Sequence, residues 1–407
     1  MMKKWKEQRV NIILGSFLGI LILLMLLATI CDHSKVSYDH LQKVEPDSVE
    51  KLADGGSVVE LTIDKSVKKC TTVAFCTPHQ YVDVYVDGRD VYSLKETAGR
   101  WGHTTGHVWN FVLLPVNTTH LTVKLSPCYP ETANALLTYY VGNGREICMG
   151  LMRQSLPTFI ISFIILIVGI YMLGYWLLVC KSEDVDATLL YLGLFSVILG
   201  LWTANETDFA KLLLVNQHAT TFAAYILLMA MPIPFVLFVR SFLDFDDKNI
   251  WRVFCGFSMV MCVISCVLHF TGIWELRQSL ILTHIVIVGL LIYLMRAIVF
   301  KFVKRQVGRR LRTCIAALIL VILASIADLI NYYKVGGNTG IWGRISFLIF
   351  IVILGVESAS KTASMLRRDR RVKELEQFAL NDTMTGLYNR NAYNYYVKSA
   401  PDRKSVV

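Results

Sequence analysis

Residues 157–180 read PTFIISFIILIVGIYMLGYWLLVC, a stretch of 24 residues without a single charged side chain. About 20 mostly apolar residues are needed for an α-helix to cross the hydrocarbon core of a bilayer. A helix on the surface of a soluble domain would instead carry polar residues along one face. The stretch therefore predicts a membrane-spanning helix.

Similar apolar segments occur on both sides of this one. Upstream, Val10–Ile30 follows a basic leader and predicts an uncleaved anchor, because its apolar run exceeds the roughly 7–15 residues of a signal-peptide core. A cleaved signal peptide is the alternative. Downstream, six more segments predict spans: 187–204, 219–241, 252–270, 279–300, 313–333 and 342–357. Pro232 and Pro234 are expected to kink the second of these six.

The composition agrees with a polytopic membrane protein. Of the 407 residues, 54% are hydrophobic and 18% are charged, which argues against a soluble enzyme. Ten Cys are too few for a disulfide-rich mini-protein, and 9 Pro and 25 Gly exclude a collagen-like chain. Residues 32–155 carry 12 Lys or Arg against 14 Asp or Glu, so the net charge of +10 comes from segments beside the spans. We expect no nucleic-acid partner.

The Lys and Arg residues also predict which side of the membrane each segment faces. Cytoplasmic loops are enriched in these two residues. Four of them lie in the leader 1–9, six in residues 301–312 and six in residues 361–373. Both termini are therefore predicted to be cytoplasmic, residues 32–155 extracytoplasmic, and the chain a multi-pass protein of the plasma membrane.

Residues 32–155 show a different pattern, in which apolar and polar residues alternate as they do in β-strands. The segments are 58–63, 71–77, 81–86, 108–114, 121–125 and 136–141. Asp87-Gly88 follows the third segment and precedes Val91-Tyr92, and Gly tolerates the positive φ that a two-residue hairpin turn requires. The pattern predicts an all-β sandwich or jelly roll with a hairpin at Asp87-Gly88.

Two kinds of residue in this region are candidates for ligand binding. Trp101 and Trp109 lie in or beside a Gly-rich segment, and exposed indole rings can stack on sugars. The alternative is that they pack in the core of the sandwich. His103, His107 and His120 could ligate a metal, but no carboxylate or thiol completes a set at close spacing, so no metal site is predicted.

Four cysteines lie in the same region: Cys70, Cys76, Cys128 and Cys148. Their even number and an oxidising exterior allow two disulfides in any of three pairings. Alternatively, they are buried thiols that pack as small apolar side chains.

Ionisable residues inside membrane spans are costly and indicate either a function or a packing contact. Asp328 lies within a predicted span, with Asn331 on the same helical face and His284 on the preceding span as a candidate partner. Such a group could form a ligand pocket or a protonation switch, or a hydrogen-bonded contact between helices. Glu206 and Asp208 fall in a predicted outer loop, where we expect them to be solvated.

After the last predicted span the chain becomes polar and helical. Residues 357–380 contain no Gly or Pro, and apolar residues recur at heptad positions. These are Met365, Val372 and Ala379 at one position and Leu375 at the matching d position, whereas Lys361 and Arg368 occupy other d positions. The pattern predicts a signalling helix that pairs weakly in a homodimer. The lipid bilayer is the other expected partner, because the cations of residues 367–373 can lie against anionic headgroups.

Residues 379–393 read ALNDTMTGLYNRNAY. This segment closely resembles the opening of the catalytic domain in the GGDEF family of diguanylate cyclases, whose D-x-L-T-G-L-x-N-R pattern follows a signalling helix. The residues that carry the resemblance are Asp382, Met384, Thr385, Gly386, Leu387, Asn389 and Arg390, with Met384 in place of the usual Leu. The layout of the chain also resembles bacterial receptors in which an outer β domain and a seven-helix block control such a cyclase.

The resemblance implies an intact parent that condenses two GTP into cyclic di-GMP with the help of Mg²⁺, in a dimer whose protomers each present one GTP. After Arg390 the only acid is Asp402, no Gly follows Gly386, and the family's Gly-Gly-Asp/Glu-Glu-Phe hairpin is missing. We therefore expect no catalytic residue and no cofactor in these 407 residues. They resemble either a fragment of a longer enzyme or a truncated product.

These patterns together predict a membrane α-helical bundle with an extracytoplasmic all-β domain. The expected parts are a leader and anchor (1–31), a β-sandwich sensor domain (32–155), a seven-helix sensing block (156–357), a cytoplasmic signalling helix (358–380) and the start of a GGDEF domain (381–407). The predicted function is a receptor that relays an extracytoplasmic or intramembrane signal, such as an unknown small ligand, to a GGDEF output. The alternatives are a non-enzymatic sensor or partner-binding protein that acts through its tail and, less favoured because no internal repeat is found, a small-solute transporter.

Overall fold

The computed structural model describes most of the chain between residues 41 and 381. The described segments are 41–63, 72–95, 104–115, 118–133, 137–180, 187–214, 217–244, 248–305 and 341–381, with isolated residues between 308 and 323 and between 387 and 392. The predicted anchor 10–30 and most of the predicted span 313–333 lie outside them. The chain divides into two compact units: Met1–Ile160 with Ala204–Ala224, and Ile161–Thr203 with Tyr225–Val407.

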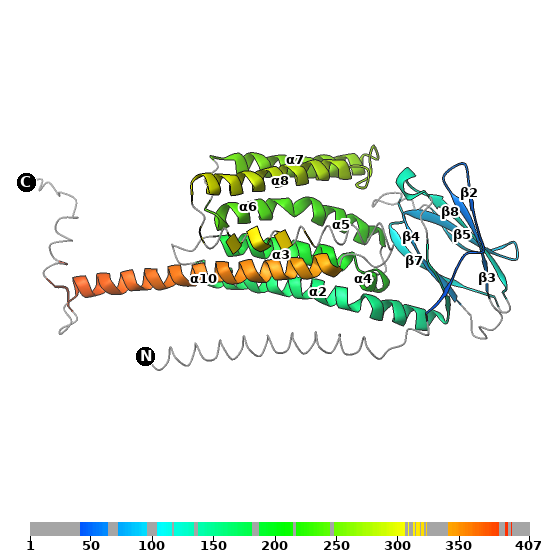
Figure 1. Ribbon diagram of the computed structural model, residues 1–407, viewed down its shortest axis with the longest axis horizontal. Helices are drawn as coiled ribbons and strands as arrows, with labels where there is room; N and C mark the ends of the chain where they lie inside the picture. The colour runs from blue at the N-terminus through cyan, green and yellow to red at the C-terminus, as the bar shows by residue number, and fades with distance from the viewer. Residues whose placement is uncertain are drawn as a thin grey trace, which may run out of the picture. The chain divides into compact units, whose positions relative to one another are not determined.

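The first unit contains a sandwich of two antiparallel sheets (Figure 1). One sheet has the strand order β1-β9-β4-β7 and the other β2-β3-β8-β5-β6. The strands are β1 (Gln42–Val44), β2 (Ser48–Lys51), β3 (Ser57–Thr62), β4 (Thr72–Pro78), β5 (Gln80–Val86), β6 (Arg89–Leu94), β7 (His107–Leu113), β8 (His120–Pro127) and β9 (Tyr139–Gly142). The six predicted strands are all present, and β6 is the second arm of the predicted hairpin. The strands β1 and β2 are the additions.

Alternating side chains build the core between the two sheets. In β5, for example, Gln80, Val82, Val84 and Val86 are buried and the residues between them are partly exposed. Apolar residues from both sheets form one cluster, to which β4 contributes Phe75. Burial of such apolar surface is the main favourable term in folding. The two short strands β1 and β2 are largely exposed, which explains why they lack the alternation that revealed the others.

The hairpin predicted at Asp87-Gly88 is confirmed. Asp87 has a φ of 49° and Gly88 a φ of 78°, and β5 pairs with β6 on either side of them. Positive φ at both central residues defines a two-residue turn whose twist matches that of the strands.

The helices include six that are long and apolar enough to cross a membrane, counted over the described residues. Their bounds are α2 (Gly144–Val179), α3 (Thr188–Asn205), α5 (Gln217–Ala230) with α6 (Pro232–Phe242), α7 (Ile250–Phe270), α8 (Leu280–Val303) and α10 (Ile341–Leu380). A short helix, α4 (Asp208–Leu213), connects α3 to α5. Six of the seven spans predicted for the helical block are thus helical. The regular helix is interrupted at Met231, directly before Pro232, although Met231 keeps helical torsions of φ −58° and ψ −39°; the predicted kink stays a prediction.

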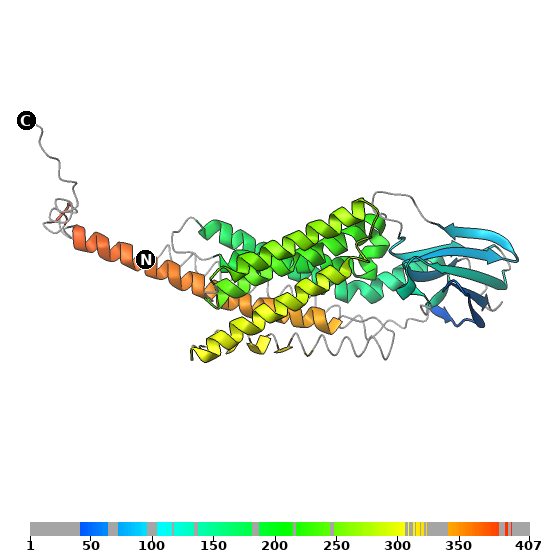
Figure 2. The same cartoon turned by 90° about the horizontal axis from the view of Figure 1, so that it is seen from above.

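Two helices differ from their predicted bounds. The helix that contains the span predicted from residue 157 begins earlier, at Gly144, and Pro157 lies inside it. The side chain of Asn143 accepts a hydrogen bond from the N–H of Arg145 and so caps the start of this helix. The last predicted span and the predicted signalling helix form a single helix, α10. In both views the orange to red part of α10 projects beyond the other helices of its unit (Figures 1 and 2).

The helical core of the second unit is closely packed. Each of α2, α3, α6, α8 and α10 contributes fully buried side chains, among them Ile165, Leu192, Val236, Ala297 and Ile351. Small residues allow membrane helices to approach closely. A Cβ atom at Gly169 of α2 would lie 2.8 Å from the backbone nitrogen of Val197 in α3. The α2 and α3 backbones therefore pack at a distance that only glycine permits at this position.

Gly169→Ala is expected to destabilise the helical unit by about 1–3 kcal/mol, because the new methyl group overlaps the α3 backbone. Gly174→Ala, on the same helix, is a matched control: a Cβ at Gly174 meets nothing within 4 Å. There the helix propensity of Ala favours the variant by up to about 1 kcal/mol. Thermal unfolding in detergent, followed by the circular dichroism of the helices, measures both. Equal melting temperatures for the two variants would contradict the close approach.

Candidate functional site

Several predicted site residues lie outside the described segments. They are Trp101, His103, Cys70, Asp328, Asn331, Asp382, Met384, Thr385, Gly386 and Arg390. Within the described residues, no group of three or more His, Cys, Asp or Glu is arranged to hold a metal ion. His284 is exposed on α8. The pairing of Asp328 with His284 stays a prediction.

Trp109, a candidate for ligand stacking, makes a polar contact with a helix. It lies on β7, and its indole Nε1 donates a hydrogen bond to Oδ1 of Asp208 at 3.2 Å. Its ring lies 6.1 Å from that of Tyr140 on β9. Asp208 was expected to be a solvated loop residue, which is wrong, since it is the first residue of α4 and accepts this hydrogen bond. The contact was missed because the two residues are 99 positions apart.

The surroundings of Trp109 are apolar. Ala74, Tyr140, Ile147 and Leu151 form a buried cluster against which Leu41, Trp109, Phe111 and Leu212 pack. The strands β4, β7 and β9 thus contact the first turns of α2 and the end of α4. We call this group, together with Cys76, Asp208 and Lys211, the Trp109 cluster.

Local sequence explains the position of Asp208. Thr207 is the N-cap of α4, and its side chain accepts a hydrogen bond from the backbone N–H of Ala210 at 3.3 Å. An N-cap threonine of this kind satisfies one of the free donors of the first turn. A carboxylate in that turn is also favoured by the helix dipole. Asp208 is therefore held at the start of α4, with its carboxylate available to Trp109.

The same surroundings affect two titrating groups. Burial raises the pKa of the Cys76 thiol to about 12; Lys211 opposes the rise and Asp208 adds to it. Burial, followed by Asp208, also raises the pKa of Tyr140. Cys76 is therefore a neutral thiol at physiological pH, and neutral thiols are poor nucleophiles.

The possible disulfides among the four outer cysteines stay a prediction, because Cys70 lies outside the described residues. The thiols of Cys76 and Cys148 are free. Cys76 lies on β4, Cys128 follows β8, and Cys148 is in the first turns of α2, so three separate elements carry them. All three are partly buried, in keeping with the packing alternative.

Two of the histidines considered as metal ligands, His107 and His120, lie on strands of different sheets. The Nδ1 atom of His120 lies 3.3 Å from the hydroxyl of Thr62. The ring of His107 packs edge-on against that of His79 at 5.1 Å. His79 is 2% exposed, has a φ of 52°, and has its Nδ1 atom 2.6 Å from the hydroxyl of Thr104. These contacts indicate a structural role for His107 and His79.

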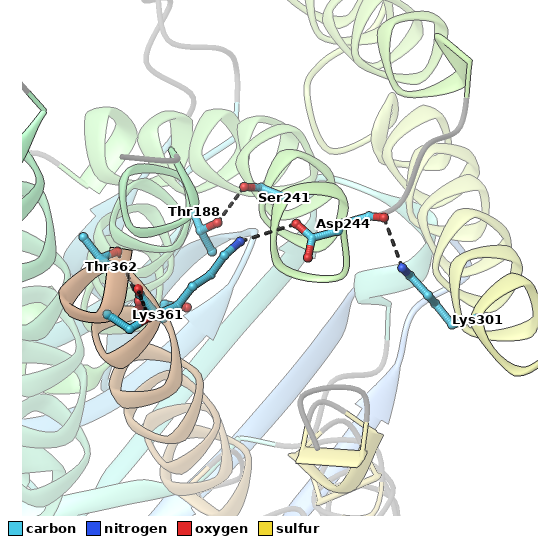
Figure 3. A network of polar contacts seen from close by, with 8 residues as sticks. Thr188, Ser241, Asp244, Lys301, Lys361 and Thr362 are labelled. Atoms are coloured by element: carbon cyan, nitrogen blue, oxygen red, sulfur yellow. Dashed lines mark hydrogen bonds and ion pairs between the residues drawn. The ribbon is translucent and has the colours of Figure 1, made fainter. Parts of the chain in front are cut away.

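In the second unit, polar side chains from four helices gather where α10 leaves the bundle (Figure 3). Asp244, just after α6, accepts hydrogen bonds from two lysines. Lys361 of α10 lies 3.4 Å from its Oδ1 atom, and Lys301 of α8 donates to its backbone carbonyl at 3.1 Å. The side chain of Lys361 is 6% exposed and that of Asp244 is 68% exposed. Lys361, which the heptad pattern marked as an unfavourable d residue, is thus a partner within the chain.

Three hydroxyl side chains lie near this ion pair (Figure 3). The hydroxyls of Thr188, at the start of α3, and Ser241, near the end of α6, lie 2.6 Å apart. Thr362, next to Lys361, donates to the carbonyl of Ser358 at 3.2 Å. We call Thr188, Ser241, Asp244, Lys301, Lys361 and Thr362 the Asp244 cluster. The sequence offered no signal for it, because its members come from four separate helices or their ends.

A second cation holds α10 near its beginning. Arg344 donates from Nη2 to the backbone carbonyl of Thr203 at 3.3 Å. Thr203 lies in the last turn of α3, where carbonyls have no partner within the helix. Arg344 and Lys361 are 17 residues apart, or about 26 Å along an α-helix. That distance is close to the thickness of the hydrocarbon core, about 30 Å.

Two residues of the GGDEF-like motif are described, and one of them ends α10. The side-chain amide of Asn389 donates to the carbonyl of Ala379, and its backbone N–H donates to the carbonyl of Leu380, both at 2.8 Å. Its Oδ1 atom accepts from the N–H of Ala392 at 3.0 Å. Asn389 therefore binds carbonyls left free at the end of α10. Leu387 is 70% exposed.

Comparison with known families agrees with the helical part of this description. Residues 157–358 match the model of a family described as 7TM diverse intracellular signalling. The match includes α3 to α8, most of α2 and the apolar part of α10. It supports a multi-pass membrane protein with a seven-transmembrane signalling domain. No match to a curated protein was found.

Trp109→Phe is expected to lower the stability of the first unit by about 0.5–1.5 kcal/mol, because it keeps the ring and removes the N–H that Asp208 accepts. Asp208→Ala combined with Trp109→Phe should cost less than the sum of the two single changes. Thermal unfolding of the unmodified chain, the two single variants and the double variant measures this double-mutant cycle. Trp274→Phe, at an exposed indole, is the control. Strict additivity would show that the hydrogen bond contributes nothing.

Cys76 is expected to resist alkylation at pH 8, because its thiolate forms only as the pH approaches the raised pKa of about 12. Mass spectrometry after iodoacetamide treatment of the folded protein measures the reaction. The exposed Cys180 is the internal control. Modification of Cys76 at the rate of the denatured chain would contradict the raised pKa.

Proposed function

We propose that this chain, whose residues 157–358 match a seven-transmembrane signalling domain, is a membrane receptor that relays an extracytoplasmic or intramembrane signal along α10 to a GGDEF-type output. Both termini are proposed to lie in the cytoplasm and the β-sandwich outside the cell. The distribution of Lys and Arg supports this orientation.

One observation carries the proposal: α10 is a single helix of 40 residues. Its first half is apolar and packs in the bundle, and its second half is polar. At about 1.5 Å per residue the helix is about 60 Å long. A continuous helix transmits a rotation or shift at one end to the other end. Asn389 then joins the end of this helix to the motif that resembles the start of a GGDEF domain.

The start of α2 supplies the proposed input. β9 ends at Gly142 and α2 begins at Gly144, so a single residue separates the sandwich from a membrane helix. The Trp109 cluster adds a second contact, from β7 to α4. A ligand-induced change in the sheet would therefore act directly on α2 and on the segment that connects α3 to α5.

The exposed face of α10 supports the proposed homodimer. Val372 is 52% exposed and Leu375 is 66% exposed, and both occupy heptad positions. Apolar side chains at these positions bury their surface when two such helices pair. A dimer would bring together two output domains. In an intact parent, those domains would use GTP and Mg²⁺; the present chain has no proposed catalytic residue.

The second candidate is a non-enzymatic sensor whose tail binds other membrane receptors. The same exposed residues, Val372 and Leu375, favour it, since they could pair with a different helix. This candidate requires no output domain on the chain itself.

The test joins the catalytic part of a diguanylate cyclase to residue 407 and measures cyclic di-GMP in cells. One to seven alanines are inserted within residues 368–378 of α10. Because an α-helix has about 3.6 residues per turn, each alanine rotates the output by about 100°. The relay predicts activity that varies with this period and returns with seven insertions, which restore the heptad. A catalytically inactive fusion is the control.

Activity that is independent of the number of inserted alanines would contradict the relay through α10. Capture of a second receptor by the unfused chain, lost in a variant with Val372→Asp and Leu375→Asp, would then favour the partner-binding candidate.

A further inference from the structure

Asp244 adopts a backbone conformation that needs support. Its φ is 46°, in the left-handed region that side chains other than Gly seldom occupy. Asp and Asn tolerate this region better than other residues, but the conformation still has a cost. Asp244 directly follows the last turn of α6, and its N–H donates to the carbonyl of Ser241 at 3.4 Å.

The two lysines that contact Asp244 come from different helices and bind different atoms. Lys301, in the last turn of α8, binds the backbone carbonyl, and Lys361, in α10, binds the carboxylate (Figure 3). The position of the carboxylate depends on the backbone torsions that the carbonyl contact helps to fix. A shift of α8 relative to α6 therefore changes the direction in which Asp244 presents its carboxylate to α10.

The direction of the Asp244 carboxylate is important because its partner, the side chain of Lys361, is buried. Lys361 is 7% exposed, and a buried ammonium group without a counter-charge is strongly unfavourable. Its neighbours Ser358 and Thr362 are each 1% exposed, so this turn of α10 is inside the bundle. Because the side chain of Asp244 is 68% exposed, only the lysine of this pair is buried, and removal of Asp244 takes a counter-charge away from a buried ammonium group.

We propose that Asp244 is a positioning residue that couples α8 to α10, so that movement of α8 releases or restores the contact that holds Lys361. The coupling goes beyond the proposed relay, because it names the helix that controls α10 and the residue through which it acts. By linkage the influence is reciprocal: a shift of α10 also acts on α8.

The test is hydrogen–deuterium exchange of the full 407-residue chain in lipid nanodiscs, read at the amides of residues 356–366. Lys301→Met removes the contact from α8, and Asp244→Asn removes the charge while keeping a residue that tolerates positive φ. Each should raise exchange at these α10 amides by roughly tenfold. Lys304→Met is the matched control, because Lys304 lies at the same end of α8 and packs over the ring of Phe300 instead.

A second variant separates the coupling from general destabilisation. Lys361→Met removes the buried charge, so the addition of Asp244→Asn to this variant should not raise exchange at the α10 amides any further. In the presence of Arg368→Met, at an exposed position of α10, Asp244→Asn should still raise exchange at these amides. The proposal is overturned if Lys301→Met leaves α10 exchange unchanged, if Lys304→Met raises it equally, or if Lys361→Met fails to relieve Asp244→Asn. The readout needs no output domain, so its failure is distinguishable from failure of the cyclase relay.

Discussion

The unbroken backbone hydrogen bonding of α10 determines how the helical unit can act. In the hydrocarbon core no water is present to bind a free N–H or C=O group, so a spanning segment must satisfy all of them within its own helix. Once helical, α10 contains no Pro or Gly between residues 356 and 380 that would end it. The polar half is therefore a continuation of the apolar half within one helix.

Charged residues define the two levels at which α10 is held. Arg344 binds a carbonyl at the end of α3, and Lys361 binds Asp244 after α6. Between them the helix packs through apolar side chains, and Gly355 lies against Met172. The hydrophobic effect is not directional, whereas a hydrogen bond is. The polar contacts at these two levels therefore add directional contacts to the apolar packing of α10.

The features that could be predicted from the sequence are those determined by neighbouring residues. The hairpin needed only Asp87-Gly88, and the interruption before α6 needed only Pro232. The span predicted from residue 157 lies inside α2, but the apolar run gave no sign of the preceding turns, which begin at Gly144 after Asn143. The GGDEF-like motif was recognised by its residues, but the way in which Asn389 binds the end of α10 required the fold.

The candidate sites could not be predicted because their partners are distant in the sequence. Trp109 and Asp208 are 99 residues apart, and Asp244 and Lys361 are 117 residues apart. In each pair, an Asp that lies between two long helices contacts a side chain of a strand or of another helix. A heptad pattern identifies Lys361 only as a poor coiled-coil residue. Its burial against Asp244 gives that irregularity a cause, since the turn of α10 that contains it belongs to the bundle, and the exposed apolar residues that follow begin beyond it.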